Sequence, residues 1–287
     1  MRYFTSLIGN SQKLDGGAMF GHVPKAIWSK WIVPDEKNRI SLACRALLIQ
    51  DENKNILLET GVGAFFDPSS RDRYGVNEAT HVLLDSLKSV GLDDTDIDIV
   101  ILSHLHFDHA GGLLDSWKQD KKPQLLFPKA KYLVSKIAWE RACNPHVRDR
   151  ASFIPELNIL LNNSGRLVMV EGEKSKLLGD DYKFLVTNGH TPGLLHTIVG
   201  VKSEPIIFVS DLIPGAPWVH LPVGMGYDRS AELLVDEKRE MLEFAIKNNA
   251  RLFYTHDSLM AMSNIMKDEN GKFIPTNLVG EFFKSSF

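Results

Sequence analysis

The sequence predicts a layered α/β protein, and three observations lead to that prediction. Short apolar runs that are typical of buried strands alternate with stretches of helical periodicity in both halves of the chain. No tandem repeat, low-complexity tract or long polar linker divides the 287 residues, which are enough to bury a large core. Several of the predicted strands also end in residues that bind metals. We therefore expect residues 1–287 to form a single domain.

The first half of the chain is predicted to hold three strands and a helix. Residues 43–50 and 55–59 are short apolar runs that predict a pair of strands. Residues 82–90 repeat apolar side chains at helical spacing, and Gly91 follows as a stop signal. Residues 97–103 are an almost continuous apolar run, as expected for a buried strand.

The second half continues the same alternation. Two segments show helical periodicity, at 138–142 and 231–248. The predicted strands are 131–134, 166–170, 182–186, 196–200, 205–210 and 251–255.

Composition excludes several classes of protein. The net charge of −3 gives no reason to expect nucleic acid or an anionic membrane as a partner. No apolar stretch approaches the ~18 residues of a membrane span, and the N-terminal apolar run is too short for a signal peptide. Cys44 and Cys143 lie far apart in the sequence and are expected to be reduced thiols, which favours a cytoplasmic protein.

The strongest chemical signal lies directly after the strand predicted at 97–103. His104, His106, Asp108 and His109 place three imidazoles and a carboxylate within six residues. Such side chains would compete for protons and desolvate one another unless a cation held them. Nitrogen and carboxylate ligands without sulfur suit zinc first, and then iron, cobalt or manganese.

Three more potential metal ligands follow predicted strands. His190 lies between glycines shortly after one strand, and Asp211 and His256 each come directly after another. Seven ligands are too many for one tetrahedral zinc, but they fit two ions that share a carboxylate. Water between two such ions would lose a proton near neutral pH and become a nucleophile.

The motif at 104–109, together with the three later ligands, resembles the metallo-β-lactamase superfamily of metallohydrolases. The resemblance implies an αββα sandwich with two metal ions at one edge. It implies two sets of ligands, which are His104, His106 and His190 at one ion, and Asp108, His109 and His256 at the other. Asp211 would bridge the ions, and Asp108 would also pass a proton to the leaving group, so we expect both aspartates to be catalytic.

The ligand set narrows the choice within the superfamily. Zinc β-lactamases place a cysteine where Asp211 stands, and flavodiiron oxidoreductases place a glutamate where His106 stands. The segments 14–21, 23–28, 211–214 and 224–228 look like those of lactonase-like members, a branch that includes N-acyl-homoserine lactonases and relatives of methyl parathion hydrolase. Glu59 stands where the superfamily often has aspartate, and it is expected to keep that residue's role as a hydrogen-bond acceptor behind a ligand.

We therefore expect a dinuclear zinc hydrolase of small esters, foremost a quorum-quenching lactonase that opens N-acyl-homoserine lactones. The alternatives are an organophosphate or aryl ester hydrolase and a glyoxalase II-like thioesterase. A metal-binding sensor or scaffold without enzymatic activity is the alternative outside the enzymes. The expected partners are a small-molecule substrate and a second copy of the chain in a homodimer.

The substrate contacts are expected in apolar loops. The apolar segment 19–31 is predicted to form a loop over the metals, ordinary core or a dimer contact. The candidate contacts are Met19, Phe20, Trp28, His220 and Tyr227. Of the other histidines, we expect His22, His81 and His146 to be surface or turn residues, and His196 to lie either behind a ligand or in the core.

Overall fold

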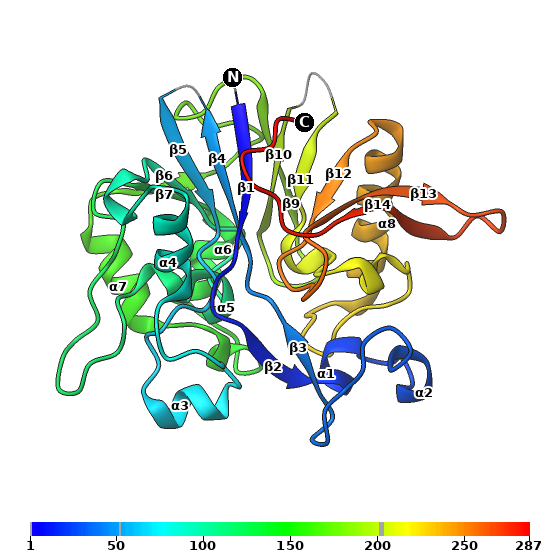
Figure 1. Cartoon of the computed structure of the whole chain (residues 1–287), viewed down its shortest axis with the longest axis horizontal. Helices are drawn as coiled ribbons and strands as arrows, with labels where there is room; N and C mark the ends of the chain where they lie inside the picture. Colours follow the sequence, from blue (N-terminus) through cyan, green and yellow to red (C-terminus); the bar gives the residue numbers. More distant parts are fainter. Residues whose placement is uncertain (1, 52, 201–203) are drawn as a thin grey trace. The chain divides into compact units, whose positions relative to one another are not determined.

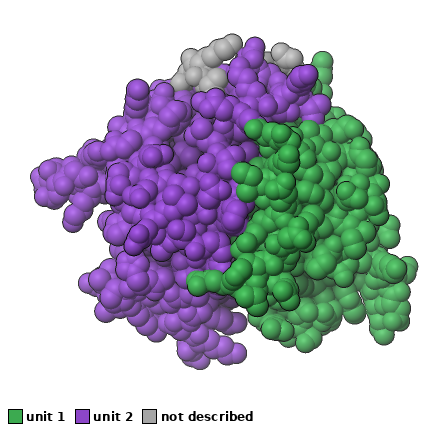
Figure 2. All heavy atoms as spheres, turned by 180° about the vertical axis from the view of Figure 1, so that it is seen from behind, with its two compact units in different colours: residues 1–12, 43–171, 281–287 green, residues 13–42, 172–280 purple. Residues whose placement is uncertain are grey.

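The computed structural model of the protein describes residues 2–51, 53–200 and 204–287. The chain forms two compact units, each assembled from segments that are distant in sequence, and Figure 2 draws unit 1 in green and unit 2 in purple. Unit 1 comprises Met1–Gln12, Ala43–Glu171 and Glu281–Phe287, and unit 2 comprises Lys13–Leu42 and Gly172–Gly280. The prediction of a single domain over residues 1–287 stays a prediction, because this division does not say whether the units fold independently.

In the described part of the chain, unit 1 holds a six-stranded mixed sheet in the order β1-β4-β5-β6-β7-β8. Its first three strands pair antiparallel, whereas β5 to β8 run parallel. Parallel strands that are buried on both faces read as continuous apolar runs, which is why β6 was recognisable from the sequence. The strands are β1 (Arg2–Leu7), β4 (Ala46–Asp51), β5 (Lys54–Leu58), β6 (Ile99–Ile101), β7 (Lys131–Ser135) and β8 (Leu167–Val170), labelled in Figure 1.

Helices pack against the sheet of unit 1. The helices are α3 (Pro68–Arg73), α4 (Val82–Ser89), α5 (Phe107–Ala110), α6 (Lys136–Cys143) and α7 (Pro155–Asn163). Leu48, Leu57 and Val100 are neighbours in the strand register, and they share one apolar cluster with Leu83 and Leu87 of α4. Helix α6 contacts β7 and β8. The apolar faces of α4 and α6 are thus buried against the sheet, which stabilises these helices and the strands they cover.

Unit 2 holds a second mixed sheet, whose described strands follow the order β14-β13-β12-β11-β10-β9. Only β11 and β12 pair in parallel, and every other pair in this sheet is antiparallel. The strands are β9 (Tyr182–Thr187), β10 (Leu194–Val199), β11 (Ile206–Phe208), β12 (Arg251–Phe253), β13 (Met262–Lys267) and β14 (Phe273–Val279).

The long helix α8 (Ala231–Lys247) forms part of the connection from β11 to β12. It buries Leu234, Met241 and Ala245 in the apolar cluster of unit 2, together with Ile207 and Leu252 of the sheet. A two-stranded sheet of β2 (Gln12–Asp15) and β3 (Arg39–Leu42) also lies in this part of the chain, with α1 (Gly16–Phe20) and α2 (Lys25–Trp28) between its strands in sequence.

The predicted fold class is confirmed, since the structure consists of two mixed sheets with flanking helices. The hairpin of β13 and β14 was missed, because most of its side chains are at least partly exposed and it has no clear apolar run. Cys44 and Cys143 are free thiols, as expected. Among the described residues, none of the helices has both the length and the apolar character needed to cross a membrane.

Candidate metal centre

The C-terminal end of β6 delivers the four ligands of the predicted motif in unit 1. The strand ends at Ile101, and Leu102 still donates a backbone hydrogen bond to the next strand, 2.8 Å from Leu133 O. The ring centroids of His104 and His106 lie 4.3 Å apart, and those of His104 and His109 lie 4.2 Å apart. The three imidazoles are buried, so the sequence motif forms one compact group of nitrogen ligands.

Glu59 orients two of these imidazoles from behind. Its Oε2 lies 2.9 Å from Nδ1 of His109, and its Oε1 accepts a hydrogen bond from Ser103 Oγ. Ser103 Oγ in turn lies 2.8 Å from Nδ1 of His104. When the Nδ1 side of a histidine is held in this way, Nε2 is the nitrogen directed to a metal. The expectation that Glu59 acts as an acceptor behind a ligand therefore agrees with the structure.

Backbone contacts hold the end of the motif against the chain that follows β5. Thr60 donates through both its N and its Oγ1 to the carbonyl oxygen of His109, at 3.0 and 3.1 Å. Gly112 makes this close approach possible, because a Cβ atom there would lie 2.1 Å from Thr60 O. Glu59 itself has a φ of 62°, an uncommon conformation for a residue other than glycine. The motif thus rests on a tightly fitted backbone rather than on a mobile loop.

In unit 2, Asp211 lies between two imidazoles. Its Oδ2 is 3.2 Å from Nε2 of His190, and its Oδ1 is 3.2 Å from Nε2 of His256. All three residues are buried. Each oxygen of one carboxylate therefore faces a different histidine, which is the arrangement expected of a carboxylate that bridges two ions.

These spacings fit metal ligands better than they fit hydrogen bonds. Two atoms bound to one tetrahedral zinc, each about 2.1 Å from the ion, lie roughly 3.4 Å apart. A hydrogen bond between a charged carboxylate and an imidazolium is shorter, at about 2.7–2.9 Å. The 3.2 Å contacts of Asp211 lie closer to the first value. The donor set is also suitable, because buried imidazole and carboxylate groups are the ligands that zinc takes in proteins.

His190 is fixed by two carboxylates that come from different segments of unit 2. Asp228 Oδ1 lies 2.9 Å from Nδ1 of His190, so the opposite nitrogen, Nε2, faces Asp211. Glu237 of α8 accepts from the backbone N–H groups of Asn188 and Gly189, at 2.7 and 2.8 Å. Burial raises the pKa of Glu237. Helix α8 thereby positions the loop that carries His190.

The position of His256 is set by backbone hydrogen bonds at the end of β12. Its N–H and that of Asp257 both donate to Pro214 O, at 2.9 and 3.1 Å. Asp257 also accepts a 3.0 Å hydrogen bond from Ala216 N through Oδ2. The segments that carry Asp211 and His256 are therefore connected directly, which fixes these two ligands relative to each other.

The five predicted substrate contacts lie in two kinds of environment. Met19, Phe20 and Trp28 are buried in the core cluster of unit 2, as ordinary core residues would be. His220 is half-buried and stacks on Trp31 with ring centroids 5.2 Å apart, and Tyr227 is 39% exposed. Contact of these residues with substrate stays a prediction, and the burial of the first three favours a supporting role for them.

Two histidine assignments are resolved by the structure. His81 was expected to be a surface or turn residue; it lies outside regular structure directly before α4, but the surface position is wrong, because the side chain is buried with its Nε2 3.0 Å from Gly112 O. Burial lowers the pKa of His81. His196 belongs to the core, where its Nε2 lies 2.8 Å from Thr187 Oγ1 and burial lowers its pKa to about 4.

Four supporting residues were missed by sequence reasoning. Ser103 directly precedes His104, and Thr60 directly follows Glu59. Serine and threonine are common at the ends of strands, so the sequence gives no signal that these two support the site. Asp228 and Glu237 are far from His190 in sequence, and acidic residues are common next to and within helices. The missed residues are Thr60, Ser103, Asp228 and Glu237.

The region that contains both groups of ligands matches a known family. A family model described as the metallo-beta-lactamase superfamily matches residues 41–256. The chain belongs to the metallo-beta-lactamase superfamily. It is accordingly a metal-dependent hydrolase, with buried His and Asp side chains suited to metal binding.

Curated members of the superfamily share limited sequence identity with the chain. An N-acyl homoserine lactonase from a Bacillus species is 25% identical over 225 residues, which cover 73% of this chain and 79% of the relative. An N-acyl homoserine lactonase from Bacillus thuringiensis is 23% identical over 242 residues, covering 76% and 82%. Both relatives are thus matched over most of their length.

Solved structures of superfamily members show the same fold. A probable metal-dependent hydrolase from Staphylococcus aureus aligns with a TM-score of 0.84 and 24% identity, over 100% of this chain and 98% of the other. AidC, a dizinc quorum-quenching lactonase in complex with a product, aligns with a TM-score of 0.75 and 24% identity, over 99% and 96%. These alignments show a shared fold along the whole chain.

Proposed function

We propose that the chain is a dinuclear zinc hydrolase that opens lactones and cleaves other small carboxylic esters. The observation that carries the proposal is the position of Asp211 between His190 and His256, with one oxygen 3.2 Å from each imidazole. A carboxylate placed in this way suits two ions better than one. The similarity to N-acyl homoserine lactonases supports lactones as the first substrates to test.

The proposed ligands are those that the superfamily resemblance implies. His104, His106 and His190 would bind one ion. Asp108, His109 and His256 would bind the other ion, and Asp211 would bind both. Bound zinc supplies Lewis-acid polarisation of the substrate carbonyl, and it lowers the pKa of water so that a nucleophile is available at neutral pH.

The protein's own groups then orient the reactants and move the proton. Asp108 is the one partly exposed carboxylate among the proposed ligands, and its Oδ1 lies 3.8 Å from Nε2 of His109. We assign to its carboxylate the transfer of a proton, which it accepts from the attacking water and gives to the leaving alkoxide. Glu59 and Asp228 keep their histidines in the orientation that binding requires, so they act through those histidines rather than on the substrate.

A panel of substrates tests the proposal on the full chain loaded with zinc. The panel contains hexanoyl-homoserine lactone, an aryl ester, a phosphotriester and a glutathione thioester. We expect the lactone to be hydrolysed fastest, and EDTA to abolish turnover. Hydrolysis of the phosphotriester alone would show that the lactonase assignment is wrong.

Metal analysis of one variant tests the two-ion arrangement. Asp211→Ala is expected to lose one or both zinc ions and most of the turnover. Asp236→Ala is the matched control, because Asp236 is an exposed aspartate of α8 that, among the described residues, pairs only with Arg239 of the same helix. Full zinc content and activity in Asp211→Ala would contradict a bridging role.

A further inference from the structure

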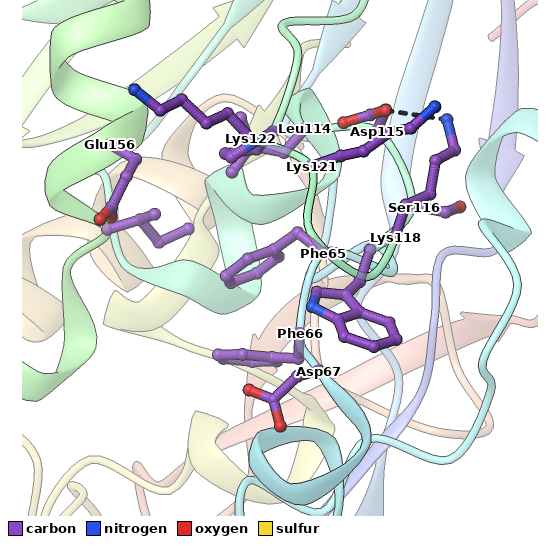
Figure 3. A pocket seen from close by; sticks show the side chains of 13 residues that line it. Phe65, Phe66, Asp67, Leu114, Asp115, Ser116, Lys118, Lys121, Lys122 and Glu156 are labelled. Atoms are coloured by element: carbon purple, nitrogen blue, oxygen red, sulfur yellow. Dashed lines mark hydrogen bonds and ion pairs between the residues drawn. The ribbon is translucent and has the colours of Figure 1, made fainter.

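Unit 1 contains a cavity of about 320 Å³ that the metal centre does not account for. Three segments form its wall, which are the chain before α3, the loop after the motif and the start of α7 (Figure 3). The apolar residues lining it are Phe65, Phe66, Leu114, Trp117, Pro123 and Ile154. A cavity of this size accommodates a small organic molecule, and an apolar wall favours an apolar body.

The aromatic wall of the cavity reaches the metal-binding motif. The ring of Phe66 contacts that of Phe107, with centroids 5.4 Å apart, and Phe107 lies between His106 and Asp108 in sequence. Ile154 follows Phe153, whose ring lies 4.9 Å from that of His106. The wall of the cavity thus contacts the motif through Phe107, and it adjoins Phe153, whose ring contacts His106.

The loop at 115–124 is held in place by its own hydrogen bonds. Asp115 and Gln124 exchange two of them, from Asp115 N to Gln124 O at 3.0 Å and from Gln124 N to Asp115 Oδ1 at 2.7 Å. Trp117 N donates to Ala64 O at 2.8 Å, which ties the loop to the opposite wall. The ring of Trp117 is nevertheless 44% exposed. The loop therefore presents an aromatic surface at a fixed place.

Three lysines of this loop surround the cavity, and two of them make no ion pair among the described residues. Lys118 Nζ pairs with Asp115 Oδ2 at 3.2 Å, whereas no such partner is present for Lys121 or Lys122. All three lysine side chains are exposed. Two positive charges therefore remain available beside an apolar wall.

None of the three carboxylates that line the cavity pairs with Lys121 or Lys122 among the described residues. Asp115 pairs with Lys118, and Asp67 accepts hydrogen bonds from Ser69 and Ser70 at the start of α3. The hydrogen bond from the Ser70 hydroxyl lowers the pKa of Asp67. Glu156 lies in the first turn of α7. The lining charges therefore sum to zero, but the ammonium groups of Lys121 and Lys122 have no ion-pair partner in the described part of the chain.

We propose that this cavity binds the non-reacting end of the substrate, and that this end carries a negative charge. The substrate class is then a lactone or ester whose acyl part has an apolar body and a second, anionic group. The body would lie against Phe65, Phe66 and Trp117, and a terminal carboxylate would accept hydrogen bonds from Lys121 and Lys122. This inference rests on the proposed function, and it adds to that function a preference for substrates whose acyl part carries a negative charge.

A matched pair of substrates tests the inference on the zinc-loaded full chain. 4-Nitrophenyl hexanoate and the mono-4-nitrophenyl ester of adipic acid have the same leaving group and a six-carbon acyl part, but only the second carries a terminal carboxylate. We expect kcat/KM to be about tenfold higher for the adipate ester, because only its terminal carboxylate can accept charge-assisted hydrogen bonds from the two lysines. The ratio of the two kcat/KM values is expected to fall to about one in K121Q/K122Q and below one in K121E/K122E.

A control pair removes the same total charge from unit 1 outside the cavity. Lys129 and Lys131 are exposed and do not line the cavity, so K129Q/K131Q should keep the preference for the adipate ester. A binding measurement without turnover uses the fluorescence of Trp117. Octanoate should alter this emission at about tenfold lower concentration than octanol, and Trp117→Phe should remove the response.

The outcomes separate the inference from the proposed function. Hydrolysis of both esters with no preference for charge, or with a preference that K121Q/K122Q retains, overturns the inference and leaves the hydrolase standing. Absence of any hydrolysis overturns the proposed function. In that case, lysine-dependent binding of octanoate still supports the anion site, and its absence overturns the site as well.

Discussion

The Nδ1 atom of His190 lies 2.9 Å from Oδ1 of Asp228, and both residues are buried. The other oxygen of Asp228 accepts a 2.6 Å hydrogen bond from Met225 N. The carboxylate of Asp228 therefore orients a proposed metal ligand, and it also stabilises the turn at Met225–Asp228 in the segment that follows Asp211. Removing its charge should weaken metal binding without removing a ligand.

Asp228→Asn is expected to lower the zinc affinity of the protein by about 10- to 100-fold, as other changes behind a metal-binding histidine do. The amide keeps an oxygen for Met225 N, so the fold should persist. Competition with a zinc chelator, monitored by absorbance, measures the affinity. Asp236→Asn on the exposed face of α8 serves as the control, and equal affinities in the two variants would contradict the role of Asp228.

Lys238 is expected to stabilise the loop that contains His220. Its Nζ lies 3.0 Å from Trp218 O and 2.9 Å from His220 O, and it also donates to Val223 O. Lys238→Met should reduce the free energy of unfolding by about 2–4 kcal/mol, because three buried carbonyl groups lose a donor. Urea titration compares it with Lys247→Met, an exposed position on the same helix. A loss no larger than that of the control would contradict this role.

His196 should make the stability of the protein depend on pH. Burial lowers its pKa from 6.5 to about 4, so the folded state holds a neutral ring while the unfolded chain takes up a proton below pH 6.5. Stability is therefore lost as the pH falls from 6.5 to about 4, by about 3 kcal/mol from this group. The measurement is urea unfolding at several pH values for wild type and His196→Gln. The difference between the two proteins isolates His196, and a pH-independent difference would refute the prediction.

Gly112→Ala should destabilise the backbone under the metal-binding motif. The added Cβ would lie 2.1 Å from Thr60 O, and overpacking of this kind costs about 1–3 kcal/mol. Thermal unfolding at a fixed zinc concentration measures the loss. Gly172→Ala is the control, because a Cβ atom there meets no other atom within 4 Å. Equal Tm values for the two variants would show that the close approach can relax.

Prediction from sequence succeeded where local pattern and tertiary position agree. The helix expected at 231–248 is α8, Ala231–Lys247, because its apolar face repeats at helical spacing. The strand expected at 97–103 contains β6, and the ligands follow it as predicted. Prediction from sequence failed for β14, because its sequence has no continuous apolar run and most of its residues are not buried. It also failed for the buried ring of His81, because the residues that precede it in sequence are mostly polar.

The sequence by itself predicted a metal-binding cluster, because the motif at 104–109 places three histidines and an aspartate within six residues and is recognisable without any distant partner. It also determined the superfamily, because the remaining ligands follow in a characteristic order. Only the tertiary structure showed which residues hydrogen-bond to the candidate ligands and orient them. Asp228 and Glu237 contact the His190 loop from positions 38 to 49 residues away, and such contacts depend on packing that no local pattern encodes. The cavity beside Phe66 is likewise a product of packing, since its three segments are separate in sequence and meet only in the fold.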